Sequence, residues 1–252
     1  MKKNIYFREV FSRPNVIKDV LLNIFLMLSI FFRIPIEVIT RKNMGERYFS
    51  LFFSVIIGLV LVITPYSLSS RYRYTDWSGM FTVYGTWYLF TAAYIFSLYL
   101  RWKEVKHDPS VFDFEKFSLS TGRIHPLFKS LEQYKWVNER VIEIIIEPGV
   151  FLVAGVILAY FGQPVGLLLI ACAVVYSLGY MAAYNLGDNF VMDQIDEMLC
   201  NEEMIEVFVK GKPSDKGVKF YARKPESEAL REELADRFIV NIDEDEDVVL
   251  AV

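Results

Sequence analysis

The sequence is poor in the residue types that build metal centres and disulfide frameworks. Its 252 residues include two histidines and two cysteines, Cys172 and Cys200. Two cysteines cannot form a disulfide framework, and neither has a metal-ligating neighbour at a useful spacing. We therefore expect no metal ion and no cofactor. The sequence also has no Asn-x-Ser/Thr glycosylation site, which is compatible with a bacterial inner-membrane protein.

Sequence motifs for common enzymatic chemistries are also missing. The glycine-flanked stretch 211–217 lacks the Gly-Lys-Ser/Thr ending that places a lysine and a hydroxyl on phosphates. No GxSxG, HExxH, EF-hand or dinucleotide-binding pattern occurs elsewhere. A non-enzymatic role is therefore the favoured expectation.

Apolar residues, in contrast, are abundant. The composition is 54% hydrophobic, 16% aromatic and 23% charged, and the mean hydropathy is +0.29. These values exclude disordered and collagen-like chains. They indicate a protein with a membrane-embedded part and a water-facing part.

Charge is divided unevenly along the chain. Residues 184–252 carry 18 acidic and 8 basic side chains, whereas the apolar remainder is net basic. A nucleic-acid-binding protein more often concentrates lysine and arginine in its water-facing part. The acidic tail therefore argues against direct nucleic-acid binding and favours membrane lipids and other protein subunits as partners.

Four uncharged stretches predict a polytopic α-helical membrane protein. They are residues 48–66, 80–100, 149–161 and 164–184, and about 20 residues of helix cross the hydrocarbon of a bilayer. We expect two transmembrane hairpins, 48–100 and 149–184, the second with a tight turn at 162–164. The second hairpin is alternatively re-entrant, because its first arm is short.

Lysine and arginine counts predict the orientation. Residues 1–47 hold nine, the loop 67–79 holds two and the loop 101–147 holds eight. Because cytoplasmic loops are enriched in positive charge, we expect an inner-membrane protein with both termini in the cytoplasm.

Residues 17–40 fit this topology least well. Their apolar run 20–32 is short and is followed by Arg33, Pro35 and Glu37. The favoured interpretation is an interfacial or re-entrant helix in the cytoplasmic leaflet. The alternative is a fifth membrane span.

The water-facing parts complete the predicted fold class, which is mainly α with a small cytoplasmic α+β domain at the C-terminus. Apolar residues three and four apart predict one amphipathic helix over 126–147. The expected domains are 1–47, 48–100, 101–147, 149–184 and the acidic tail 185–252. Within the tail we expect helices at 189–200 and 225–238 and strands at 206–210, 218–223 and 248–252.

Small residues four apart predict close helix packing in the second hairpin, within the chain or between subunits of a homo-oligomer. The candidate helix-packing residues are Gly155, Ala159, Ala173, Ser177, Gly179 and Ala183. Tyr176, Tyr180 and Tyr184 repeat at the same spacing. We expect this tyrosine stripe to be a helix contact rather than a ligand-stacking surface.

Three carboxylates form the main candidate chemical site. Glu143 and Glu147 share one helix face at the cytoplasmic mouth of the second hairpin, and Asp188 leaves the hairpin at the same level. Together they are a candidate cation or proton site. The favoured interpretation is that they are headgroup-level charges pairing with Arg140 or lipid.

Three functions remain open from the sequence. The favoured one is a non-enzymatic inner-membrane component of a multiprotein assembly, for example secretion or conjugation machinery. The alternative is an oligomeric channel or transporter lined by the second hairpin. A third is an intramembrane or interfacial enzyme that uses Glu143, Glu147, Asp188 or His107.

Overall fold

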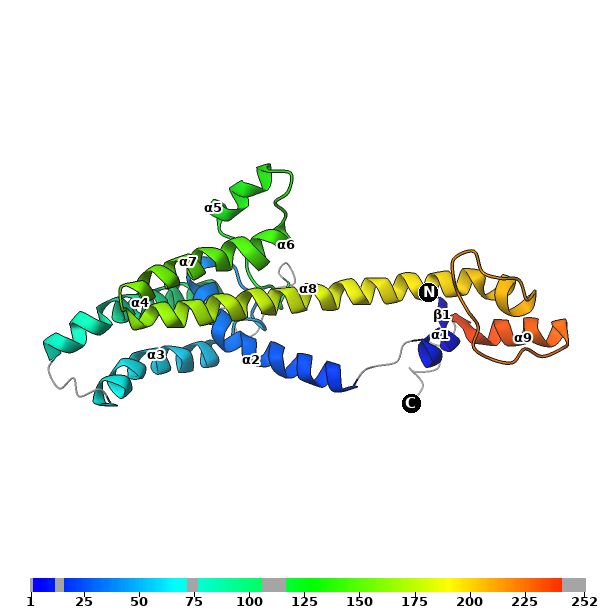
Figure 1. The fold of residues 1–252 in the computed structure, drawn as a ribbon, viewed down its shortest axis with the longest axis horizontal. Helices are drawn as coiled ribbons and strands as arrows, with labels where there is room; N and C mark the ends of the chain where they lie inside the picture. Colours follow the sequence, from blue (N-terminus) through cyan, green and yellow to red (C-terminus); the bar gives the residue numbers. More distant parts are fainter. Residues whose placement is uncertain (1, 12–15, 72–76, 106–116, 242–252) are drawn as a thin grey trace. The chain divides into compact units, whose positions relative to one another are not determined.

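The computed structural model describes residues 2–11, 16–71, 77–105 and 117–241 (Figure 1). These residues pack as two units. One unit joins the two ends of the chain, Met1–Leu21 and Asn185–Val252, and the other is Leu22–Tyr184. The two are called here the terminal unit and the helical unit. His107 lies outside the described residues.

The helical unit begins with α2 (Val16–Thr40), α3 (Leu51–Arg71) and α4 (Trp77–Val105). Helices α3 and α4 lie side by side as an antiparallel hairpin (Figure 1). Two side chains of α4 bond to the α3 backbone, since Trp87 Nε1 donates to the Leu61 carbonyl at 2.8 Å and the Tyr94 hydroxyl to that of Ser54 at 2.8 Å. Trp87 and Tyr94 thus join the two helices, while the Thr86 hydroxyl donates to Gln163 at 2.7 Å, in the turn before α8.

The single helix predicted over residues 126–147 is broken, and that prediction is wrong. The chain forms α5 (Pro126–Lys129), a 3₁₀ turn (Ser130–Gln133) and an irregular stretch before helix resumes at α6 (Glu139–Val141). Helix resumes there because the Asn138 side chain caps the new start, accepting from the Val141 N–H at 2.9 Å. From Glu139 the chain stays helical through a π-turn, η2 (Ile142–Ile146), into α7 (Glu147–Tyr160).

Four helices are long and apolar enough to cross a membrane, which makes the chain a candidate multi-pass membrane protein. They are Val20–Thr40, Leu51–Leu68, Glu139–Tyr160 and Pro164–Val209. The short predicted arm 149–161 is lengthened by residues 139–148. Helix α4 is not among the four, because its tyrosine, tryptophan and threonine residues lower its mean hydropathy.

The second hairpin closes tightly between α7 and α8 (Pro164–Met204). The turn between them contains Gly162, whose φ is +73°. A Cβ on Gly155 would lie 2.9 Å from the carbonyl oxygen of Gly166, and one on Gly166 would lie 2.4 Å from the Ala159 nitrogen. The two helix backbones therefore touch at these glycines.

The terminal unit contains the short α1 (Ile5–Val10), the second half of α8, a π-turn η3 (Ile205–Val209) and α9 (Glu228–Phe238). Its only strands among the described residues are β1 (Lys2–Asn4) and β2 (Ile239–Asn241), which pair antiparallel with Asn4 opposite Ile239. The prediction of an α+β domain formed by the tail alone is therefore wrong. Residues 189–200 belong to α8, and residues 248–252 lie outside the described part of the chain.

The two strands predicted in the tail are also wrong. Residues 205–209 continue the helix as η3, and Val207, Phe208 and Val209 are all buried, which an alternating strand would not allow. Residues 218–223 have no regular secondary structure. Phe220 nevertheless packs into the core, with its ring 4.2 Å from that of Tyr6 and 4.3 Å from that of Phe208.

The N-terminal segment completes this core. Asn4 is fully buried: its backbone N–H donates to Glu197 at 2.7 Å, and its side-chain amide donates to Asn201 at 2.8 Å and caps α1. The Tyr6 hydroxyl accepts from the Tyr221 N–H at 2.7 Å, and burial raises the pKa of that phenol. Residues 200–238 thus share their core with Tyr6, Phe7 and Val10.

The close approach of α7 and α8 predicts that a glycine substitution at the contact is destabilising and that one away from it is not. Gly166→Ala should destabilise the helical unit by about 1–3 kcal/mol, because the new methyl group meets backbone atoms of α7. Gly149→Ala is the control, since a Cβ there meets nothing within 4 Å. Thermal unfolding of the purified protein in mild detergent measures both, and equal midpoints for the two variants would contradict the packing described.

The burial of Asn4 predicts that the N-terminus stabilises the terminal unit. Asn4→Ala should cost about 2 kcal/mol, because it removes a helix cap and leaves buried partners unpaired. The exposed Asn189→Ala on α8 is the matched control. Limited proteolysis should cut residues 205–241 faster in the first variant only. Indistinguishable cleavage rates would show that the N-terminus is dispensable for this core.

A buried ion network as the candidate functional site

Charged side chains of the helical unit gather on one face of the end of α2. Arg33, Glu37 and Arg41 are four residues apart along the chain, so they lie on the same side of the helix axis. Arg41 directly follows the last residue of α2. Glu37 and Arg41 are fully buried and Arg33 is 6% exposed.

Arg41 joins three parts of the helical unit. Its Nη2 lies 2.7 Å from Glu147 at the start of α7, and its Nη1 lies 3.0 Å from Glu143 in η2. The same Nη1 also donates to the hydroxyls of Tyr180 on α8 and Thr121. One guanidinium therefore ties the end of α2 to the helix 139–160 and to α8.

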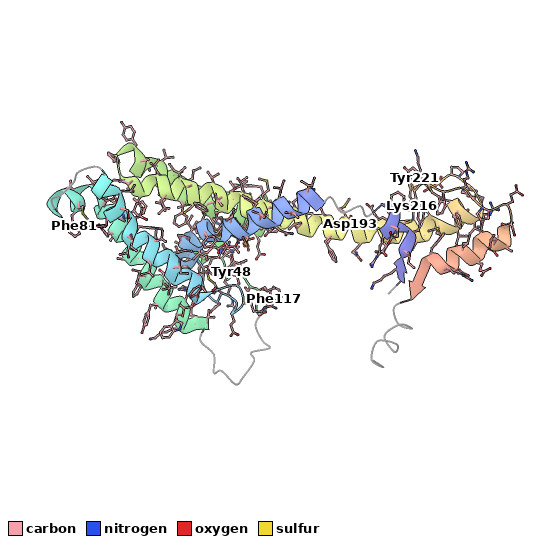
Figure 2. The ribbon with its side chains drawn as sticks, turned by 90° about the horizontal axis from the view of Figure 1, so that it is seen from below. Tyr48, Phe81, Phe117, Asp193, Lys216 and Tyr221 are labelled. Carbon is pink, nitrogen blue, oxygen red and sulfur yellow. The ribbon has the colours of Figure 1, made fainter. Side chains whose placement is uncertain are left out.

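Arg33 and Glu37 form a second pair beside the first. Arg33 donates to Glu37 through Nε at 3.0 Å and through Nη2 at 2.9 Å. Tyr48, which precedes α3 and is labelled in Figure 2, donates from its hydroxyl to Glu37 at 2.6 Å and accepts from Arg33 at 2.9 Å. The segment between α2 and α3 is thereby bound to α2.

The predicted tyrosine stripe of α8 supplies one hydroxyl to each of three carboxylates. Tyr176 donates to Glu147 at 2.7 Å, Tyr180 to Glu37 at 3.0 Å and Tyr184 to Glu143 at 2.6 Å. Both arginines also lie over the ring of Tyr180, Arg33 at 4.1 Å and Arg41 at 4.7 Å from its centroid. The tyrosine stripe thus contacts the neighbouring helices through hydrogen bonds from its hydroxyls to their carboxylates.

We call Arg33, Glu37, Arg41, Glu147 and their tyrosine partners Tyr48, Tyr176 and Tyr180 the buried ion network. Two arginines face two carboxylates within it, and Glu143, whose side chain is 12% exposed, lies at its edge. Three buried side-chain polar atoms lack a partner in the described part of the chain, and none belongs to the network. A buried charge that is paired and hydrogen-bonded in this way avoids the large cost of an isolated one.

The chemistry open to this network is limited by its two guanidinium groups. Arginine stays protonated in proteins, and it offers donors but no acceptor. Each carboxylate is held by an arginine and by a phenol, so none faces an open site as a base or a ligand would. The arrangement is suited to fixing helices rather than to moving ions or protons.

Two of the three predicted carboxylates, Glu143 and Glu147, are brought together around Arg41. The Arg140 guanidinium lies over the Tyr184 ring at 5.1 Å. Asp188 is exposed and belongs to the terminal unit. In the described residues no group of three or more His, Cys, Asp or Glu side chains is placed to hold a metal ion.

The predicted helix-packing residues take different positions. Gly155 and Ala159 face α8 at Gly166, and a Cβ on Gly179 would lie 3.1 Å from the Arg33 side chain of α2. Ala173 is buried, and the Ser177 hydroxyl donates to the Ile144 carbonyl at 2.6 Å. Ala183 is exposed.

Sequence reasoning missed Arg33, Glu37, Arg41 and Tyr48 as members of a site. Arg33 and Glu37 follow a short apolar run and, by their place in the sequence, indicate only its polar end. The available signal was the Arg-x₃-Glu-x₃-Arg spacing, which places three charges on one helix face. No pattern in the sequence indicates that Glu147 and Tyr180, 106 and 139 residues from Arg41, are their partners.

Comparisons with known proteins give no match to a family model, a curated protein or a solved structure.

The pairing of Arg41 predicts a large effect for a small change. Glu147→Gln should destabilise the helical unit by about 3 kcal/mol, because a fully buried guanidinium loses one of its carboxylates. Glu46→Gln removes the same charge from an exposed position and should change stability by less than about 0.5 kcal/mol. Tryptophan fluorescence during thermal unfolding in detergent compares the two. Similar midpoints would mean that the ion network contributes little to stability.

Proposed function

We propose that the chain is a non-enzymatic, multi-pass subunit of an inner-membrane assembly, and that its terminal unit binds a partner protein on the cytoplasmic side. Secretion and conjugation machines are assemblies of this kind. The observation that carries the proposal is an exposed apolar stripe on the second half of α8. It lies opposite the face that packs into the core of the terminal unit.

The shared core of the two chain ends supports one topology. Because β1 pairs with β2, both ends of the helical unit return to the same side of the membrane. The number of crossings is then even, which argues against five spans made of α2, α3, α4, α7 and α8. Two sets of four remain: the four candidate spans, which include α2, and the hairpins α3 with α4 and α7 with α8. We favour the hairpins because α4 packs along α3, and we assign α2 an interfacial or re-entrant position, with the lysine- and arginine-rich side in the cytoplasm.

The second half of α8 supports a water-facing location for the terminal unit. Residues 185–204 include six acidic side chains and no basic one. The carboxylates are Asp188, Asp193, Asp196, Glu197, Glu202 and Glu203. Such a segment is not stable in hydrocarbon.

The apolar stripe on this part of α8 consists of Val191, Ile195 and Met198. Their exposed fractions are 55%, 45% and 61%. Spacings of four and three residues place them on one helix face, whereas Cys200 and Met204 face the core of the same unit. In the described residues, the second half of α8 therefore has two apolar faces. The face with Cys200 and Met204 is buried in the core, and the face with Val191, Ile195 and Met198 is exposed.

The stripe and its borders define the partner. The same helical periodicity places Asp188 and Glu202 at its two ends. Glu202 already pairs with Lys216 at 2.5 Å, so the feature left for a partner is the apolar stripe itself, which the apolar face of a partner helix complements. An anionic membrane surface would be repelled by the same carboxylates.

The alternative of a channel lined by the second hairpin has less support. A shallow groove along this hairpin is lined by apolar residues such as Ile145, Leu152 and Val174. Glu147, which precedes the groove residue Pro148, is paired with Arg41 in the buried ion network. A pore lining would instead need polar groups that face water.

Two methionine substitutions on α8 test the proposal. Met198→Glu places a charge in the stripe and should reduce recovery of the partner at least tenfold. Met192→Glu is the matched control, since Met192 is similarly exposed at 56% but lies about 100° away around the helix. Tagged protein is isolated in gentle detergent from its native host, and partners of fixed stoichiometry are quantified by mass spectrometry and native mass.

Three outcomes are informative. Loss of a stoichiometric partner in Met198→Glu alone supports the proposal. Isolation of a symmetric homo-oligomer without other subunits, whichever variant is used, favours the channel. Equal loss in both variants shows that the stripe is not the binding surface.

A further inference from the structure

A large cavity opens beside the end of α2 in the helical unit. Its volume is about 950 Å³, within the range of ligand pockets. The segments 42–43, 121–126 and 129–130 line it, together with Glu139, Glu143 and Tyr184. Four of its lining residues are basic or imidazole side chains, namely Lys42, Arg123, His125 and Lys129.

Two of the cations are fixed as direct neighbours. Lys42 and Arg123 form an isolated antiparallel bridge, in which the Arg123 N–H donates to the Lys42 carbonyl at 2.7 Å and the Lys42 N–H to the Arg123 carbonyl at 3.5 Å. Side chains of such a pair lie on the same face, with Cα atoms about 5.5 Å apart. Like charges directly opposite each other are destabilising unless an anion lies between them.

Close backbone packing holds the chain segments that carry Lys42 and Arg123 together. Gly122, with a φ of +94°, lets its strand pass so close that a Cβ there would lie 3.0 Å from the Lys42 carbonyl oxygen. Lys42 is also the residue after Arg41, which the ion network holds in place. The backbone positions of Lys42 and Arg123 are therefore fixed, and their exposed side chains both line this cavity.

The acidic residues of the cavity do not neutralise the cations. Glu143 already pairs with Arg41 at 3.0 Å and accepts from the Tyr184 hydroxyl at 2.6 Å. Lys42, Arg123 and Lys129 form no ion pair with any residue that the structure describes, and Glu139 is the one remaining carboxylate in the lining. The cavity keeps an excess of positive charge.

The geometry points to a phosphate-binding site in this cavity, with Lys42 and Arg123 as its centre and Lys129 at its rim. A phosphate diester or monoester offers several oxygens that an arginine and a lysine can share. Lys42 lies two residues beyond the apolar helix 20–40, and lipid headgroups lie near the ends of apolar membrane helices, whether these span the bilayer or lie at its interface. The phosphate is presented either by an anionic phospholipid or by a small molecule in water.

Binding by the full-length protein in detergent tests this site. The probes are short-chain phosphatidylglycerol, short-chain phosphatidylcholine and inorganic phosphate, and the readout is the ligand-induced shift in thermal midpoint. Lys42→Gln/Arg123→Gln should weaken binding about tenfold or more, since each cation near an anionic surface contributes substantially. The matched control is Arg47→Gln/Lys135→Gln, which removes one arginine and one lysine exposed outside the cavity.

The removal of charge repulsion gives a second readout. Without added ligand, Lys42→Gln/Arg123→Gln should unfold at the same temperature as the parent protein or slightly higher, because two like charges no longer face each other. A lower midpoint together with unchanged ligand binding would show a purely structural pair and would overturn the proposal.

The probes also separate the sources of the phosphate. A shift with phosphatidylglycerol alone identifies a lipid headgroup, and a shift with inorganic phosphate as well identifies the phosphate group itself. In both cases the cavity variant must lose the shift and the control variant must keep it. No shift with any probe, or equal loss in both variants, would overturn the proposal.

Discussion

The helical unit depends on the pairing of two arginines that are removed from water. A guanidinium cannot give up its proton at an accessible pH, so burial forces the chain to bring carboxylates to it. Arg41 is fully buried and receives carboxylates from η2 and α7 and a phenol from α8. The position of α2 against these helices follows from that requirement, because an apolar contact alone would tolerate sliding and rotation along the helix axis.

The ion network also explains why the apolar helix 139–160 carries glutamates at its start. Glu143 and Glu147 would be costly in an apolar segment that had no cation beside it. The π-turn η2 lies where both side chains turn toward Arg41, and π-turns are frequent at positions of functional or structural constraint. Local helix geometry and long-range charge pairing therefore coincide at Glu143 within η2 and at Glu147 directly after it.

The sequence alone predicts the apolar helices of the helical unit well, because a run of about 20 uncharged residues has few other stable forms. It also places the tyrosine stripe correctly on one helix face. It does not predict the partners of that stripe, since Arg41 and Tyr180 are 139 residues apart. Their meeting depends on the packing of α2 against α8, which no local pattern contains.

The terminal unit shows the opposite difficulty. Residues 206–210 include two valines and a phenylalanine, which are typical of strands, yet residues 205–209 continue the helix, because a short apolar run fits a buried helix equally well. Phe208 then meets Phe220 and Phe238 from elsewhere in the unit. A tail of about 60 residues buries little surface alone, and residues 2–11 supply the missing apolar contacts through Tyr6 and Phe7. Because the two chain ends share one core, the fold of the tail cannot be predicted from the tail alone.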